Sequence, residues 1–406
     1  MFARPFAPAL LLLAAVPCFF AAPRSSAADA AAPLPAWRKI VVDPAFRSEG
    51  VAVADVNRDG KADIMVGDFW YEAPAWKKHE IRPLTPNLGD GAHTYSEAFC
   101  VFADDVNGDR WPDMIVVGFP GKPCVWYENP QNAPGDPRWK ERTISASACN
   151  ETPIFVPNLL GDKKARLVFA VQPEGRMCWF SPPQDNPDAP WIRHAVSEAN
   201  APGTQVFSHG LGAGDVNNDG RPDVLVKEGW WEQPRDAKTG SGPWTFHPAD
   251  LGEDCANFVA LDLNGDGKND AVSSSAHRKG IWWHEQGTEC KFSRHLLLDA
   301  FSQSHALVLA DLNGDRRPDI ITGKRWWAHG PDGDVEPNAA PVLVWIEAQA
   351  GKNGRPPAFA VHPIDDASGI GTQFVVADMN GDKQPDIVVS NKRGVFVFAQ
   401  VRPGRG

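Results

Sequence analysis

A short acidic loop that recurs along the chain restricts the fold of this protein more than any other sequence feature. Six intact copies read DVNRDGKAD, DVNGDRWPD, DVNNDGRPD, DLNGDGKND, DLNGDRRPD and DMNGDKQPD, and they begin at Asp55, Asp105, Asp215, Asp262, Asp311 and Asp378. A seventh, degenerate copy, NLLGDKKAR from Asn158, keeps Asp162 but lacks the other acidic positions. Repeats spaced by about 50 residues are typical of propeller blades or of stacked arrays, so we expect one structural unit repeated along the chain.

Each loop has the same neighbours, and these neighbours have the pattern of β-strands. An apolar segment such as HALVLA precedes the loop and one such as IITG follows it; then come an aromatic segment such as GWWEQP and a last one such as WTFHPA. The 37 Pro and 36 Gly residues supply turns between the segments. Four short strands joined by tight turns make one blade of a β-propeller.

The two ends of the repeated region complete each other. The last copy stops after its third strand, whereas residues 37–42, WRKIVV, have the pattern of a fourth strand. Pairing these ends would remove an open sheet edge, which is a hazard in all-β proteins. We therefore predict an all-β fold, in which residues 37–400 form one seven-bladed β-propeller closed by an N-terminal strand that completes the last blade.

The N-terminus and the charge place the protein in a cellular context. Residues 1–30 combine Arg4, an apolar run and small residues near a cleavage point, as in a secretory signal peptide. A lipoprotein signal through Cys18 is the weaker alternative, because Pro17 stands where a small residue is preferred. We expect a secreted, periplasmic or extracellular protein that is not transmembrane. The net charge of −11 argues against nucleic acid as a partner. The remaining six cysteines, even in number, suggest disulfides, whose pairing the sequence leaves open.

The spacing of the acidic loop suits a hard cation. Oxygen ligands at the first, third and fifth positions, with a later carboxylate closing the shell, fit calcium. The alternative is a set of Asx-turns that need no ion. The expected calcium ligands are Asp55, Asn57, Asp59, Asp63, Asp105, Asn107, Asp109, Asp113, Asp215, Asn217, Asp219, Asp223, Asp262, Asn264, Asp266, Asp270, Asp311, Asn313, Asp315, Asp319, Asp378, Asn380, Asp382 and Asp386.

These motifs resemble two known groups of proteins. The DxNxDGxxD loop in a repeat of about 50 residues is similar to the FG-GAP/VCBS repeats of integrin α-subunit propellers and of secreted bacterial proteins, where the loops bind calcium and brace the blades. The segments DFWYEAP, VWYENP, EGWWEQP and SQSHALVLADLNGDRRPDIITGKRWWAHG resemble the propeller domain of aldos-2-ulose dehydratases, which are sugar lyases. That family continues past its propeller into cupin-type domains, whereas this sequence ends at Gly406.

A second group of polar residues precedes the innermost strands and should gather at the mouth of the channel opposite the acidic loops. We expect His209, His305 and a carboxylate such as Glu97 to hold a divalent metal there, zinc or another, with His209 and His305 acting as ligands or base. Tyr95 or Lys227 would act as the acid. The alternative is a polar, water-filled channel. The Trp pairs at 230–231, 282–283 and 326–327 should lie in third strands between blades, and the fourth-strand histidines should be cross-strand partners.

Two functions from different classes remain. The resemblance implies a metal-assisted carbon–oxygen lyase, a sugar dehydratase that acts on a ketosugar or anhydrofructose at the channel mouth. The alternative is a non-catalytic propeller that binds a glycan or a protein partner. Both readings make a carbohydrate or another small molecule the expected ligand.

Overall fold

The repeated segments form the strands that the sequence predicts. The computed structural model describes residues 34–401 except 87, 132, 134–137, 184–185, 240–241 and 350–356. The expected signal peptide and Cys18 lie outside these residues. The described ranges contain two short 3-10 helices, η1 (Ala237–Thr239) and η2 (Thr288–Cys290), and no helix in them could span a bilayer.

Five antiparallel sheets have four strands each. Three of them are β2 (Ala52–Ala54), β3 (Asp63–Val66), β4 (Phe69–Glu72) and β5 (Lys77–Glu80); β6 (Cys100–Asp104), β7 (Asp113–Val117), β8 (Lys122–Glu128) and β9 (Lys140–Ala148); and β10 (Ile154–Val156), β11 (Arg166–Val171), β12 (Arg176–Ser181) and β13 (Ile192–Ala195). The other two are β22 (Leu307–Ala310), β23 (Asp319–Gly323), β24 (Leu343–Gln349) and β25 (Ala358–Asp365); and β26 (Val375–Ala377), β27 (Asp386–Asn391), β28 (Gly394–Val401) and β1 (Ala36–Asp43).

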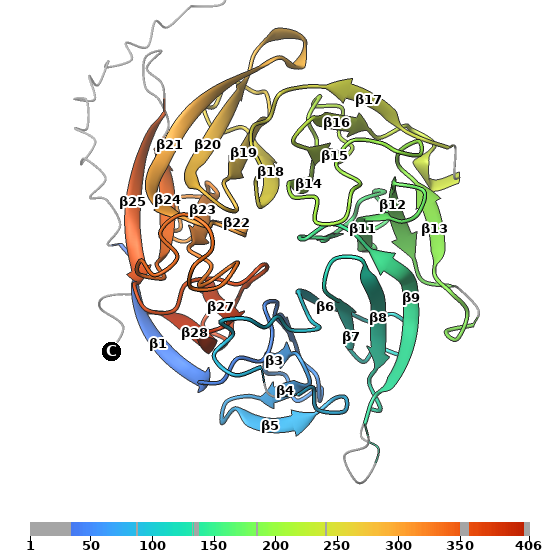
Figure 1. The fold of residues 1–406 in the computed structure, drawn as a ribbon, viewed down its shortest axis with the longest axis vertical. Coiled ribbons are helices and arrows are strands. Elements are labelled where there is room, and N and C mark those ends of the chain that lie inside the picture. The colour runs from blue at the N-terminus through green and yellow to red at the C-terminus, as the bar shows by residue number, and fades with distance from the viewer. Residues whose placement is uncertain are drawn as a thin grey trace, which may run out of the picture. The chain divides into compact units, whose positions relative to one another are not determined.

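A sixth sheet has eight strands, in the order β17-β16-β15-β14-β18-β19-β20-β21. Its first half is β14 (Leu211–Gly214), β15 (Asp223–Val226), β16 (Gly229–Glu232) and β17 (Thr245–Pro248). Its second half is β18 (Asn257–Leu261), β19 (Asp270–Ser274), β20 (Lys279–Gln286) and β21 (Phe292–Ser302). Each half is antiparallel, and a parallel pairing of β14 with β18 joins them. The six sheets surround a common axis (Figure 1). The fold is thus all-β and propeller-like.

The N-terminal strand closes the ring, as predicted. β1 pairs with β28 in antiparallel register, with Trp37 opposite Gln400 and Ile40 opposite Val397. The last sheet therefore takes one strand from the start of the repeated region and three from its end. The closure gives this sheet four strands, as in the other four-stranded sheets.

The core lies between neighbouring sheets. The second strand of each unit is buried along its whole length, as in β3, β7, β15 and β23. One cluster joins Val168 and Trp179 of one sheet to Val224 and Trp231 of the next. Because both faces of these strands are covered, their sequences are continuous apolar runs rather than alternating ones.

The fourth-strand histidines are cross-strand partners of tryptophans, as expected. His194 lies opposite Trp179, and the two rings stack with centroids 3.6 Å apart. The same stacked arrangement recurs for Trp70 and His79, Trp230 and His247, and Trp345 and His362. Each pair adds ring contact at the outer part of its sheet.

Two expectations about side chains were wrong. Trp326 and Trp327 were expected in a third strand, but they lie in the long connection between β23 and β24, and the third strand contributes Trp345 instead. All six cysteines in the described part of the chain are free thiols, five of them buried, so the expected disulfides are not formed there. The cysteines are distributed over several sheets, where they behave as small apolar residues.

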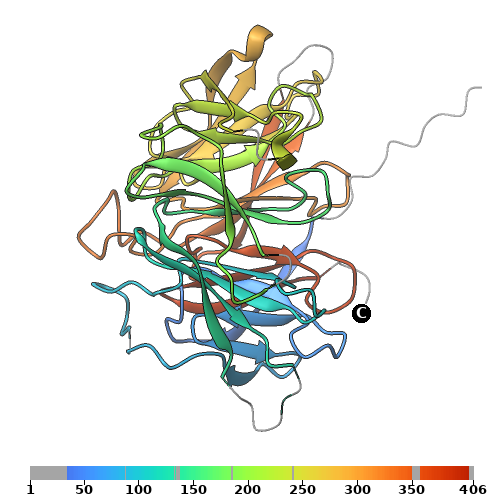
Figure 2. The same ribbon diagram turned by 90° about the vertical axis from the view of Figure 1, so that its right-hand side faces the viewer.

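Two long connections meet on one side of the ring. One joins β5 to β6 and the other joins β23 to β24, and both protrude on the same side in the edge-on view (Figure 2). The Tyr95 hydroxyl, in the first connection, donates to the main-chain oxygen of Ala328, in the second, over 2.9 Å. These connections border the residues of the candidate site.

Candidate functional site

Three histidines from different segments converge at the mouth that the sequence points to. His209 precedes β14, His277 follows β19 and His305 precedes β22. One ring nitrogen from each lies within 4.8 Å of the others. The Nε2 atoms of His209 and His277 are 3.1 Å apart. Three imidazoles at this separation can share one metal ion.

The other ring nitrogens face polar groups outside the cluster. His305 Nδ1 lies 3.2 Å from the main-chain oxygen of Gln303, and His277 Nδ1 lies 3.3 Å from Asp334 Oδ1. The backbone of Phe207 hydrogen-bonds to the His209 ring. We assign the proton of His305 to Nδ1 on this basis, so that its Nε2 lone pair points into the cluster.

His305 Nε2 is the atom that most needs a partner. The side chain is fully buried, and Nε2 has no hydrogen-bond partner among the described residues. Burial and the nearby Arg325 lower the pKa of His305 well below its usual value, so the ring is neutral. A neutral imidazole with a bare, buried Nε2 is the form that binds metals.

Glu151 supplies a carboxylate to the same cluster. Its Oε2 lies 2.8 Å from His209 Nε2, and its Oε1 lies 3.5 Å from His305 Nε2 and accepts from Arg325 Nη1 over 2.6 Å. Burial alone would raise the pKa of Glu151, but His209, Arg325 and His305 outweigh it and hold the pKa well below its usual range. The Glu151 carboxylate is therefore ionised and next to the Nε2 atoms of His209 and His305.

Arg325 links this cluster to a second buried carboxylate. Its Nη2 lies 3.9 Å from Glu49 Oε1, and Glu49 accepts from the hydroxyl and the backbone N–H of Ser96. Arg325 Nε and Nη2 have no hydrogen-bond partner among the described residues. Burial raises the pKa of Glu49 despite the neighbouring cation. Two guanidinium donors thus remain for water or a ligand oxygen.

The predicted site residues separate into two groups. His209 and His305 meet in the cluster, and Lys227 lines a pocket with His209 and His277, where its Nζ lies 2.5 Å from Asp254 Oδ1. Tyr95 lies apart, bonded to Ala328, under the Lys392 ammonium at 4.4 Å from its ring centroid.

Glu97, expected to assist the histidines, is exposed to solvent. The buried carboxylate of the cluster is Glu151 instead, since the strand entry before β10 turns its glutamate inward while the entry before β6 turns Ser96 inward. His277 follows a second strand, and that position alone brings it to this mouth, whereas Asp334 carried no sequence signal. Asp334 lies in an irregular connection, where spacing predicts nothing.

Two pockets of about 320 Å³ adjoin the cluster. One pocket is lined by Ser208 and His209, among others. Lys227, Asp254 and His277 line both pockets. Each volume suits part of a small-molecule ligand, because typical ligand pockets range from about 300 to 1,000 Å³. A molecule bound here would touch Lys227 and the exposed edge of the histidine cluster.

The acidic loops show a different use of their carboxylates. In the loop from Asp215, the Asp219 N–H lies 2.9 Å from Asp215 Oδ1 and 3.1 Å from Asn217 Oδ1, and the Gly220 N–H donates to Asp215 Oδ2. These are Asx-turn bonds. The first and third oxygens thus converge on one amide.

The last carboxylate of each loop accepts hydrogen bonds from backbone amides. Asp223 is buried and accepts the Val216 N–H on one oxygen and the Gln233 N–H on the other. Equivalent bonds hold Asp63, Asp113, Asp270 and Asp386, and Asp319 accepts from Leu312. Backbone amides thus hold these six carboxylates against the blade, by both oxygens in five of them and by one oxygen in Asp319.

Comparisons with known proteins agree with the fold. Residues 262–322, which run from one acidic loop through the next, match the family of FG-GAP-like repeats. No curated protein matches the sequence significantly. The chain is thus a β-propeller-like protein that contains an FG-GAP-like repeat.

Solved structures resemble it at low sequence identity. The structure of BBS1N in complex with ARL6DN is 12% identical, covers 91% of this chain and 98% of its own, and superposes with a TM-score of 0.52. An Agrocybe aegerita lectin that recognises non-reducing terminal N-acetylglucosamine is 14% identical, with 90% and 86% covered and a TM-score of 0.44. The exotype rhamnogalacturonan lyase YesX is 12% identical, with 91% and 74% covered and a TM-score of 0.43. These likenesses concern the fold.

Proposed function

We propose that this protein is a metal-dependent sugar lyase whose centre consists of His209, His277, His305 and Glu151. The observation that carries the proposal is the buried, unpartnered Nε2 of His305 beside two further imidazoles and an ionised carboxylate. Nitrogen ligands with one carboxylate suit zinc or a similar divalent ion better than calcium. The donor set therefore fits the metal that the channel residues suggested.

The residues around the centre fit the elimination of water from an oxidised sugar. A divalent metal held here would supply a Lewis acid for the ketone oxygen. A hydrogen bond to Asp254 raises the pKa of Lys227, so the side chain stays protonated, and we assign this ammonium to the departing hydroxyl as its hydrogen-bond and proton donor. Asp254, beside Lys227 in the adjoining pocket, is the carboxylate that we assign to accept the proton next to the ketone.

We further propose that the eight-stranded sheet is two blades, which makes the ring seven-bladed. Each half is a complete antiparallel unit of four strands, and the parallel pairing between the halves is limited to three residue pairs, Leu211–Asn257, Gly212–Phe258 and Ala213–Val259. Such a pairing of innermost strands is what close packing of neighbouring blades around the axis would produce. We also retain secretion, directed by residues 1–30, as a proposal.

Calcium binding by the acidic loops is a proposal with a specific competitor. The first and third loop oxygens converge, which supports an ion site, but the last carboxylate is held by the strands, which supports Asx-turns alone. An ion would then take its remaining oxygens from the fifth position, the backbone and water.

The decisive experiment measures metal content and turnover together. Purified protein is analysed for zinc and other transition metals and then incubated with a panel of ketosugars while the ultraviolet absorbance of an enone product is followed. His305→Ala should lose both the metal and the activity, and His247→Ala, an outer-strand histidine stacked on Trp230, should keep both. Absence of bound metal and of turnover in the wild type would refute the enzyme.

A metal-binding protein without turnover would favour the alternative, a propeller that binds a glycan or a protein at the same mouth. The buried Arg325 donors left without partners favour a ligand with acceptor oxygens there in either case. Glycan binding measured with and without the metal would then identify the ligand.

A further inference from the structure

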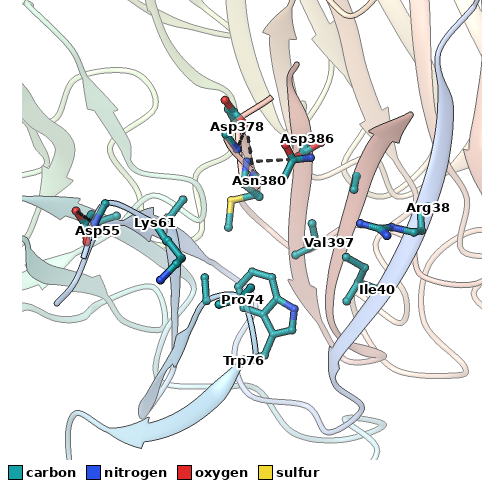
Figure 3. A pocket seen from close by; sticks show the side chains of 17 residues that line it. Arg38, Ile40, Asp55, Lys61, Pro74, Trp76, Asp378, Asn380, Asp386 and Val397 are labelled. Carbon is teal, nitrogen blue, oxygen red and sulfur yellow. Dashed lines mark hydrogen bonds between the residues drawn. The ribbon is translucent and has the colours of Figure 1, made fainter. Parts of the chain in front are cut away.

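A pocket of about 570 Å³ lies at the seam where the ring closes. One wall is the sheet of β1 and β28 together with the loop after β26. The other wall is the loop between β2 and β3 together with the residues that follow β4. Arg38 and Ile40 of β1 lie opposite Ala399 and Val397 of β28, so their side chains share one face of that sheet. Figure 3 shows Trp76 and Pro74 facing Ile40 and Val397 across the pocket.

This pocket is separate from the histidine cluster. Asp55 and Asp378, which line it, follow the innermost strands β2 and β26. The mouth residue Glu49 precedes β2, so the pocket and the mouth lie at opposite ends of the same strand. A ligand in this pocket would not touch the proposed metal centre.

The closing seam lacks a side-chain amide that bridges four of the other seams. At four other seams, a side-chain amide near the end of a third strand donates to the preceding unit, where the acceptor is the main-chain oxygen of the second residue of the acidic loop. The pairs are Asn129 to Val56, Gln233 to Leu159, Gln286 to Val216 and Gln400 to Leu312, over 2.7–3.0 Å. At the closing seam the amide position is Ala73, and the matching carbonyl belongs to Met379. No donor reaches that carbonyl among the hydrogen bonds of the described residues. Alanine leaves open the space that asparagine or glutamine fills at those four seams.

The walls of the pocket are apolar and its polar groups are mostly occupied. Trp76, Ile40, Met379 and Val397 provide aromatic and aliphatic surface. The carboxylate oxygens of Asp55 accept loop N–H groups, and Lys61 is paired with Asp59 over 2.6 Å. Asp378 likewise accepts loop N–H groups.

Arg38 is the exception among these polar groups. Its side chain points into the pocket in Figure 3, and no ion pair holds it within the described part of the chain. A single free guanidinium above an apolar floor matches an anionic group on an apolar body, because a guanidinium binds a carboxylate through two parallel hydrogen bonds. A hydroxyl-rich sugar would leave its polar groups unpaired against these walls.

We propose that this seam pocket binds a small aromatic carboxylate, with the ring between Trp76 and Ile40 and the carboxylate on Arg38. The ligand class follows from the apolar walls and the single unpaired cation. Asp55 and Asp378 of two acidic loops line the pocket, but the histidine cluster takes no part in the binding, so the proposal is independent of the proposed lyase activity.

The test uses 2-naphthoate as the probe, titrated into the full-length protein by calorimetry, with 2-naphthylmethanol and glucuronate as comparison ligands. Ala73→Gln restores the amide of the sibling seams and should abolish binding by filling the pocket. Arg38→Gln should weaken naphthoate binding by about tenfold or more, because it removes a charge-assisted hydrogen bond. Lys39→Gln is the matched control, since Lys39 is the next residue on β1 and pairs with Asp365 instead.

The outcomes separate clearly. Naphthoate binding that is lost in Ala73→Gln, weakened in Arg38→Gln and retained in Lys39→Gln supports the proposal. Three results overturn it: the wild type does not bind naphthoate at millimolar concentration, the wild type binds glucuronate more tightly than naphthoate, or Arg38→Gln binds naphthoate as tightly as the wild type does. If Ala73→Gln does not fold, as judged by circular dichroism, the comparison of Arg38→Gln with Lys39→Gln still decides the question.

Discussion

Replacing Glu151 by Gln tests whether the mouth of the channel is organised by buried charge. Glu151 and Arg325 have side chains that are 5% and 2% exposed and are joined over 2.6 Å. Glutamine has the same shape and keeps an acceptor oxygen, but it removes the negative charge. Arg325 would then have only Glu49, whose nearest oxygen is 3.9 Å away.

The expected cost can be worked from this geometry. Breaking a buried ion pair by removing one partner costs about 3–5 kcal/mol, since the remaining charge is left uncompensated. We expect the lower end, about 3 kcal/mol, because the glutamine oxygen still accepts one hydrogen bond and Glu49 remains nearby. For a domain of this size, with an unfolding entropy of roughly 0.8 kcal/mol per degree, the melting temperature should fall by about 4 °C.

The assay is thermal and urea unfolding in the presence of EDTA, so that lost metal binding does not contribute. Glu285→Gln is the control, because Glu285 forms a similar pair with His295 but is 40% exposed, and surface pairs contribute about 0–1 kcal/mol. Adding Arg325→Met to Glu151→Gln should restore part of the stability by removing the orphaned cation. Equal melting temperatures for Glu151→Gln and the wild type would refute the electrostatic reasoning.

Three further predictions follow from the same contacts. Asp334→Asn should weaken zinc binding about tenfold to a hundredfold, because Asp334 orients His277 from outside the metal shell; unchanged affinity in a competition titration would exclude that role. EGTA should lower the melting temperature of the wild type, and Asp215→Asn, which removes the charge and keeps one of the two Asx-turn bonds, should reduce that response; a melting temperature that EGTA leaves unchanged would favour turns without calcium. His247→Ala should cost about 1 kcal/mol in urea unfolding by removing the ring stacked 4.2 Å from Trp230, and a loss near zero would show that the stack is not stabilising.

The architecture could be predicted from the sequence because its signals are local. Loop, strand and turn chemistry repeat within each unit, so the strands, the closure of β28 by β1 and the pairing of His194 with Trp179 follow from spacing alone. The acidic loop was recognised for the same reason. The sequence did not show a second role of its last carboxylate: a strand of period two predicts which side Asp223 faces, but not that the Val216 and Gln233 amides each donate to one of its oxygens.

The candidate site was only partly visible in the sequence. His209 and His305 stand at equivalent positions before innermost strands, and this made them candidates. Glu151 stands at the equivalent position before β10, but position did not distinguish it from Glu97 as the carboxylate of the cluster, and Asp334 reaches His277 from an irregular connection. The six thiols, expected to form disulfides, are kept apart or buried by the same packing.

Repetition along the chain therefore dictated the strands and their order, because each blade is specified by residues close together in sequence. The position of the functional groups was decided only when the ring closed, because closure brings together residues from blades that are far apart in sequence. Burial in that closed ring then sets their charges: Glu151 is ionised beside Arg325 and His305 is neutral with a free Nε2. Ring closure also forms the pocket at the seam, because it brings Ala73 of the first sheet next to Met379 and Val397 of the last sheet.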